Sequence, residues 1–232
     1  MSKTLLVTAS PSKADVSNSR KVAFHFVECL KKESQQTLSL THLDLCNEHP
    51  IDLSATALGA MAKVKAGQKL CFEEENALKE FYKHVSLFQE HRNIIIASPL
   101  WNFGVPPRLK AYIDAIVIPG KTFRYTDKGA EGLLSGKGMR LAYIQASGSL
   151  ASQPPISTIE HGSKYVTDVF RFMGVDDITT IFVEGVAIPT LAKAAVAIAN
   201  KEAEELAKKW CQTVWTQPVV GEAHSTGSSH SG

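Results

Sequence analysis

A loop that combines aromatic rings with small residues is the part of this sequence best suited to bind a ligand. It follows the apolar run 94–97 and precedes a helical pattern that begins at Arg108. Open α/β sheets place ligands in the loops that follow parallel strands, and large flat side chains beside exposed amides suit a planar heteroaromatic ring. The candidate ring-binding residues are Pro99, Leu100, Trp101, Asn102 and Phe103.

A second, polar loop over residues 10–19 lies between the first apolar run and a helical pattern over 20–32. Hydroxyl and amide side chains, together with the free N–H groups of a helix N-terminus, form a phosphate site without a lysine. Serine and asparagine are also the usual capping residues, so an ordinary N-cap is the alternative. The aromatic loop expected at the same sheet edge favours phosphate binding. The candidates are Ser10, Ser17, Asn18 and Ser19.

A third candidate loop follows the apolar run 140–146. Its small residues bring backbone amides close to the edge of a ring, although a plain surface turn fits the same residues. The sequence lacks both the GxGxxG fingerprint and the P-loop pattern, so a mononucleotide with one phosphate fits better than a dinucleotide. The candidates are Ala146, Ser147, Gly148 and Ser149.

The elements that must position these loops alternate along the chain, which predicts an α/β fold: a five-stranded parallel sheet with helices on both faces. In such a sheet the ligand crevice lies beyond the first and third strands, where the strand order reverses. The expected strands are 5–9, 37–45, 93–97, 140–146 and 178–183, and the expected helices are 20–32, 72–90, 108–114, 159–173 and 190–210.

Two segments break this alternation. Residues 47–69 are expected to form a surface excursion with a short helix. Residues 121–126 are expected to form a small strand that a glycine-rich loop follows.

The whole chain is expected to form one globular domain over residues 1–210, with a disordered tail over 211–232. A formal net charge of +2 with scattered Lys and Arg argues against nucleic acid binding. No apolar run approaches the roughly 18 residues of a membrane span. The chain begins directly with a strand pattern rather than a signal peptide, so we expect a cytoplasmic protein.

The four cysteines show no CxxC spacing, and the histidines show no HExxH or HxH grouping. The cysteines are therefore expected to be reduced thiols. The same spacing predicts that the protein binds no metal.

Two motifs carry a resemblance to a known family. Residues 98–114, SPLWNFGVPPRLKAYID, resemble the ring-binding motif of the FMN-dependent NADH azoreductases, which are also quinone reductases. Residues 122–126, with the glycines that follow up to Gly136, resemble a second signature of that family. The 17–19 loop and the segment 182–185 match as well, so the resemblance covers residues 3 to about 209.

The resemblance implies a flavodoxin-like fold and a homodimer with FMN at its interface. It implies that the 10–19 loop holds the phosphate and ribityl end, that residues 100–103 line the isoalloxazine ring, and that residues 146–149 contact its pyrimidine side. Tyr125 and Phe172 match positions that shape the substrate pocket from the partner subunit, whereas the residue types alone also fit core packing.

This chain departs from the family at the third loop. The family often has a Gly-Gly pair where Gly148-Ser149 stands, and some members have a histidine where Leu150 stands. No histidine contact to the ring is therefore expected.

The activity that the resemblance implies is two-electron transfer from NADH or NADPH, through flavin N5, to quinones and azo compounds by a ping-pong mechanism. No catalytic side chain is required, because the flavin carries the chemistry. Three alternatives remain open: a one-electron carrier, a redox-sensing or scaffold protein that holds FMN without turnover, and an FMN-free binding module. The near-neutral charge of the chain argues against the carrier, which is typically acidic.

Overall fold

The computed structural model describes residues 3–34, 38–48 and 54–212. At its centre lies a parallel sheet of five strands, as the sequence predicted, and the strand order is β2-β1-β3-β6-β7. The strands are β1 (Thr4–Thr8), β2 (Leu40–Asp44), β3 (Asn93–Pro99), β6 (Arg140–Ala146) and β7 (Asp177–Val183). β2 begins later than expected, and Thr37 lies outside the described residues.

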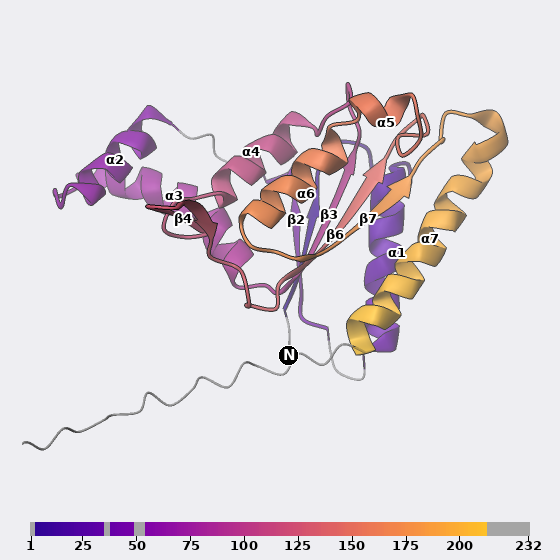
Figure 1. The fold of residues 1–232 in the computed structure, drawn as a ribbon, viewed down its shortest axis with the longest axis horizontal. Helices are drawn as coiled ribbons and strands as arrows, with labels where there is room; N and C mark the ends of the chain where they lie inside the picture. Colours follow the sequence, from indigo (N-terminus) through magenta and orange to yellow (C-terminus); the bar gives the residue numbers. More distant parts are fainter. Residues whose placement is uncertain (1–2, 35–37, 49–53, 213–232) are drawn as a thin grey trace, which may run out of the picture.

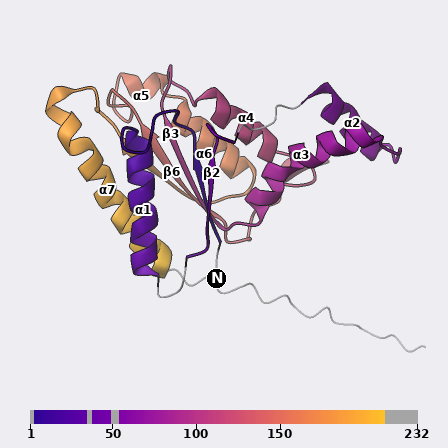
Figure 2. The same cartoon turned by 180° about the vertical axis from the view of Figure 1, so that it is seen from behind.

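Helices cover both faces of the sheet (Figures 1 and 2). On one face lie α1 (Asn18–Glu33) and α7 (Pro189–Gln212), and on the other lie α3 (Phe72–Gln89), α4 (Pro107–Ile116) and α6 (Gly162–Phe172). α2 (Ala55–Lys65) packs against α3 and projects from the body with it. None of the helices in the described ranges is long and apolar enough to cross a membrane.

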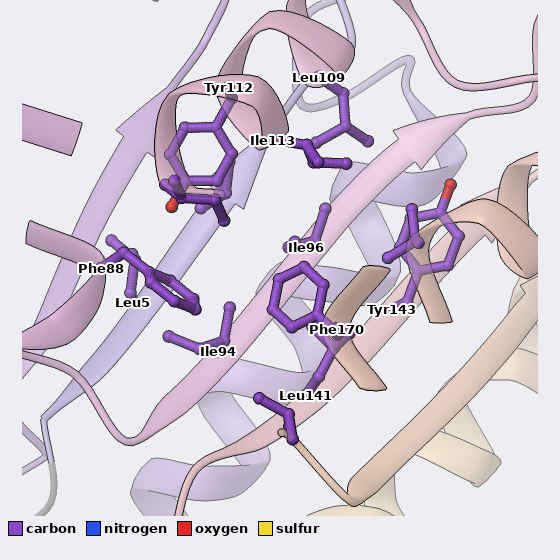
Figure 3. Packing of buried hydrophobic residues seen from close by; sticks show 14 of the residues in the cluster. Leu5, Phe88, Ile94, Ile96, Leu109, Tyr112, Ile113, Leu141, Tyr143 and Phe170 are labelled. Carbon is purple, nitrogen blue, oxygen red and sulfur yellow. The ribbon is translucent and has the colours of Figure 1, made fainter. Parts of the chain in front are cut away.

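The strands are apolar on both sides because each faces a helical layer. In β3, Ile94 and Ile96 belong to the cluster beneath α4 and α6, whereas Ile95 points to the cluster beneath α1 and α7. Figure 3 shows Ile94 and Ile96 beside Phe170 of α6 and Leu141 of β6. Burial on both faces is the reason that buried parallel strands read as continuous apolar runs.

Two expectations were wrong in detail. The segment expected as a glycine-rich loop contains a strand, β5 (Gly129–Gly132), which pairs antiparallel with β4 (Phe123–Thr126). Glycine has low strand propensity, so the glycines of β5 led the sequence analysis to predict a loop rather than a hairpin.

The helix expected over 159–173 begins three residues later, as α6, and a short helix, α5 (Ile156–Ile159), precedes it. The Glu160 carboxylate, which lies between the two helices, accepts hydrogen bonds from the amide and the hydroxyl of Ser163 in the first turn of α6.

The tail begins later than expected, because α7 continues to Gln212. The remainder of the proposed disordered tail, residues 213–232, lies outside the described residues. The 47–69 excursion contains α2, and its residues 49–53 also lie outside them.

Candidate functional site

The strand order reverses between β1 and β3, which lie side by side at the centre of the sheet. Thr8 at the end of β1 pairs with Ala97 of β3 and with Asp44 of β2, so the loops after these strands leave the same edge. The structure therefore confirms that the strand order reverses between the first and third strands, which is the position where α/β sheets form their ligand crevice.

The aromatic loop contains a tight turn. Trp101 and Gly104 exchange two backbone hydrogen bonds, of 3.0 and 2.9 Å, and the two residues between them have left-handed backbone: φ is 47° at Asn102 and 66° at Phe103. A turn with left-handed backbone at both central residues reverses the chain within two residues, but this conformation strains a bulky residue such as phenylalanine. The turn leaves the side chains of Trp101 and Phe103 44% and 45% exposed, so two aromatic rings face solvent at the sheet edge.

Backbone contacts from two neighbouring elements hold this turn. The amide of His161 donates to the carbonyl of Phe103 at 2.7 Å, and the amide of Leu100 donates to the carbonyl of Ala146 at 2.7 Å. Glycine at 162 leaves room for this packing, because a Cβ there would lie 2.9 Å from Cδ1 of Leu100 and 2.5 Å from Oε1 of Gln145. The sequence analysis did not identify Gly162, because the apolar periodicity predicted one continuous helix over 159–173.

A buried polar network lies under the loop. Ser98 and Tyr143 share a hydrogen bond of 2.8 Å between their hydroxyls, and the Tyr143 hydroxyl donates to Oε1 of Gln145 at 3.1 Å. All three side chains are fully buried, and burial raises the pKa of Tyr143 above its usual range. The network fixes the ends of β3 and β6, because breaking one bond would leave a buried polar group unpaired.

The polar loop after β1 ends in an N-cap. Oγ of Ser17 accepts a hydrogen bond from the amide of Arg20 at 3.4 Å and lies 3.3 Å from Oγ of Ser19. Ser17 therefore acts as an ordinary N-cap of α1, which is the alternative that the sequence left open. It leaves the amides of Asn18 and Ser19 without an acceptor in the described part of the chain, so the helix start retains two donors for an anion.

Arg20 is a positioning residue that sequence reasoning missed. Its Nε and Nη2 donate to the carbonyl of Ser10 at 3.1 and 2.6 Å, and its Nη1 and Nη2 donate to the carboxylate of Asp44 at 2.9 and 2.7 Å. Burial alone would raise the pKa of Asp44, but the hydrogen bonds from Arg20 and the Cys46 amide outweigh it and lower that pKa. The fork of Arg20 thus fixes the Ser10 loop to the ends of β1 and β2.

The third loop is joined to the chain after β7 rather than being a free surface turn. The amide of Ser147 donates to the carbonyl of Val183 at 3.0 Å, while the carbonyls of Gly148 and Ser149 accept from the amides of Ala187 and Gly185 at 3.1 and 3.0 Å. Among the candidate residues 146–149, the amide of Ser147 is therefore already bonded within the protein. Those of Gly148 and Ser149 have no acceptor among the described residues.

The two expected substrate-pocket residues lie together, but away from these loops. Tyr125 and Phe172 both contact the buried ring of Phe123, with centroid distances of 5.3 and 4.9 Å, and they are 75% and 40% exposed. Phe172 ends α6, ten residues and about 15 Å along the helix from Gly162 beside the aromatic turn. Figure 1 likewise shows β4 well separated from α5. One chain does not bring these residues to its own sheet edge.

The donors and surfaces at this edge suit a ligand with a phosphate at one end and a flat ring at the other. The start of α1 offers the free amides of Asn18 and Ser19 to the phosphate. The aromatic turn offers apolar surface to the ring, and the amides of Gly148 and Ser149 offer donors to acceptors on its edge.

Comparisons with known proteins point the same way. Residues 2–209 match the family described as having a flavodoxin-like fold. An FMN-dependent NADH:quinone oxidoreductase of Staphylococcus haemolyticus is 36% identical, over 90% of this chain and 99% of the relative. A protein of the same name from Staphylococcus carnosus is 32% identical over 90% of this chain and 100% of its own length.

Solved structures agree with this similarity. An FMN-dependent NADH-azoreductase from Bacillus anthracis, solved in complex with FMN, is 32% identical and superposes with a TM-score of 0.84, covering 91% of this chain and 100% of its own. An azoreductase from the same species is 29% identical with a TM-score of 0.83, covering 90% of this chain and 100% of its own.

Proposed function

Because this chain belongs to the flavodoxin-like family that includes the FMN-dependent NADH:quinone oxidoreductases, we propose that it is an FMN-dependent oxidoreductase that passes electrons from NADH to quinones and azo compounds. The observation that carries the proposal is the strained, solvent-facing turn of Trp101 to Gly104 at the edge where the strand order reverses. Strain of this kind persists where the surroundings impose it and is concentrated at functional sites.

We assign the FMN contacts to the three loops at this sheet edge. The phosphate and ribityl end is assigned to Ser10 and residues 17–19, where the amides of Asn18 and Ser19 have no acceptor among the described residues. The ring is assigned to Pro99 and residues 100–103, and its pyrimidine edge to residues 146–149. Arg20 has no direct contact in this assignment and holds the Ser10 loop in place.

When bound, FMN would supply the redox chemistry, which is hydride uptake at N5 from NADH and delivery of two electrons to the acceptor. The proposal has the nicotinamide and the acceptor use one pocket beside the aromatic turn, one after the other, which is a ping-pong scheme. The amides of Gly148 and Ser149 would stabilise negative charge on the pyrimidine edge, as fixed donors do for developing anions. No side-chain acid or nucleophile is required.

A second copy of the chain completes the substrate pocket in this proposal. The support is the exposure of Tyr125 and Phe172 on a surface that is remote from their own sheet edge. Rings that are exposed around a buried neighbour are typical of an interaction surface. We also propose a cytoplasmic location, in keeping with four cysteines that are all unpaired.

The test begins with the purified protein after incubation with FMN. We expect a yellow protein that retains FMN, is bleached by NADH without oxygen, and is reoxidised by a quinone in a two-electron step. Steady-state rates at varied NADH and quinone should give parallel double-reciprocal lines, and NADPH serves as the comparison donor. A folded protein that refuses FMN would support the binding-module alternative. FMN that NADH reduces only slowly would support a carrier or a sensor instead.

A further inference from the structure

A histidine, a cysteine and a glutamate meet where α1 packs against α7. Nε2 of His25 lies 2.9 Å from Oε1 of Glu204 and 3.5 Å from Sγ of Cys29. One ligand atom from each residue lies within 4.8 Å of the other two, and no other group of three such side chains is as compact in the described ranges. Figures 1 and 2 both show α1 and α7 side by side along their length.

The spacing of these atoms matches a tetrahedral metal site. Two ligands bound to one zinc ion at about 2.0–2.3 Å lie roughly 3.3–3.8 Å apart. The His25–Cys29 distance of 3.5 Å falls within this range, and the His25–Glu204 distance of 2.9 Å needs only a small rotation of an exposed carboxylate to reach it. The donor set of nitrogen, sulfur and one oxygen suits zinc, whereas calcium and magnesium prefer several oxygens.

We propose that His25, Cys29 and Glu204 bind a zinc ion that bridges α1 and α7, with water in the fourth coordination position. This revises the expectation, drawn from residue spacing alone, that the chain binds no metal. The i, i+4 spacing of His25 and Cys29 places both on one face of α1. The third ligand lies 179 residues after His25, so only the packing of the two helices reveals it.

The surroundings admit the ion from solvent. The side chains of His25 and Glu204 are 33% and 48% exposed, while Cys29 lies underneath them at 8%. The charges of Glu28 and Glu33 raise the pKa of the Cys29 thiol and that of Lys32 lowers it. Lys31 forms an ion pair with Glu28 at 2.8 Å.

Binding requires a proton to leave the Cys29 thiol for solvent as its sulfur coordinates zinc, with no change in oxidation state. Burial, followed by the charge of Glu204, raises the pKa of this thiol.

This site is separate from the flavin edge. His25 lies seven residues after Asn18, roughly 10 Å along α1 from the helix start that faces the phosphate. Zinc binding is therefore measurable on the FMN-loaded protein by readouts that are independent of turnover.

The experiment titrates zinc chloride into the FMN-loaded protein against a fluorescent zinc indicator. We expect about one zinc per chain. Affinity should fall at least about tenfold in Cys29→Ser and in Glu204→Gln. Cobalt should give a thiolate charge-transfer band that is absent from Cys29→Ser. Zinc should raise Tm in the parent protein and not in the two variants, since the ion binds the folded state.

The matched controls are Glu205→Gln, which removes the same charge one residue along α7, and Cys211→Ser, which removes an exposed thiol of that helix. Both should bind zinc as the parent does. Parent-like binding in Cys29→Ser and Glu204→Gln would overturn the proposal, as would a parent protein that does not compete with the indicator. FMN content and circular dichroism establish that each variant is folded.

Discussion

Two left-handed residues, Asn102 and Phe103, determine which way the aromatic turn points. Asparagine tolerates this backbone region, but phenylalanine occupies it at a cost on the order of 1 kcal/mol. The contact between the Phe103 carbonyl and the amide of His161 keeps the residue there. The backbone conformation that exposes the ring of Phe103 is therefore unfavourable for folding. A ligand-binding role for the ring accounts for it.

Replacing Phe103 with glycine separates these two effects. Glycine adopts a φ of 66° without strain, so Tm should not fall, and it should rise if the relief exceeds the added freedom of the unfolded chain. Loss of the ring should weaken FMN binding about two- to tenfold, the value of one aromatic contact. Fluorescence titration with FMN and thermal unfolding measure both quantities. Phe72→Ala, which removes an exposed ring on α3, should leave FMN affinity unchanged. Unchanged affinity in the Phe103 variant would remove this ring from the site.

Among the secondary-structure elements, the start of α1 was predicted most accurately from the sequence. The residues 17–19 were recognised as a helix start, and the structure adds that Ser17 is the cap and that Asn18 is already the first helical residue. Local capping chemistry is visible in a sequence because the donor and the acceptor are three residues apart. The fork from Arg20 to Asp44 was not visible, since it joins residues on different elements.

The free amide of Asn18 can be removed without breaking the helix. Proline is favoured at the first helical position, and the extended backbone of Ser17, with φ −71° and ψ 116°, is what a residue before proline adopts. Asn18→Pro should therefore change the free energy of unfolding by less than about 1 kcal/mol. FMN affinity should fall about fivefold or more, because the backbone N–H of residue 18 is lost as a donor to the phosphate, together with the Asn18 side-chain amide.

Riboflavin, which lacks the phosphate, is the control ligand for this variant. Its affinity should be the same for the parent and for Asn18→Pro. An equal loss for both ligands would mean that the change disturbs the ring site, and the phosphate assignment would then fail.

At the scale of the molecule, the five-stranded parallel sheet was predictable because buried strands and their alternation with helices can be recognised locally in the sequence. Contacts that depend on two distant segments were not, such as Gly162 against Gln145 or Glu204 beside His25. The glycine-rich strand β5 was missed for a different reason, since pairing with β4 outweighs its poor propensity. What the sequence left out is mainly the set of long-range contacts that hold the loops in place.

The shared pocket is the claim that only an assembly can test. Two variants of the chain serve: one with the ring turn disabled, Trp101→Ala with Phe103→Ala, and one with the remote rings removed, Tyr125→Ala with Phe172→Ala. If each pocket takes its turn from one copy and its rings from the other, a mixed dimer holds one intact pocket and one doubly damaged pocket. Random exchange makes about half of the dimers mixed, so about a quarter of all pockets become intact.

Quinone reductase activity should therefore rise above that of either parent variant when the two are mixed, exchanged and assayed with excess FMN. The rise should follow subunit exchange measured by size-exclusion chromatography of differently tagged chains. Mixed dimers without any gain would mean that Tyr125 and Phe172 act within their own chain or only in packing. A protein that stays monomeric at assay concentration would contradict the shared pocket directly, because Phe172 then remains about 15 Å along α6 from the Gly162 end.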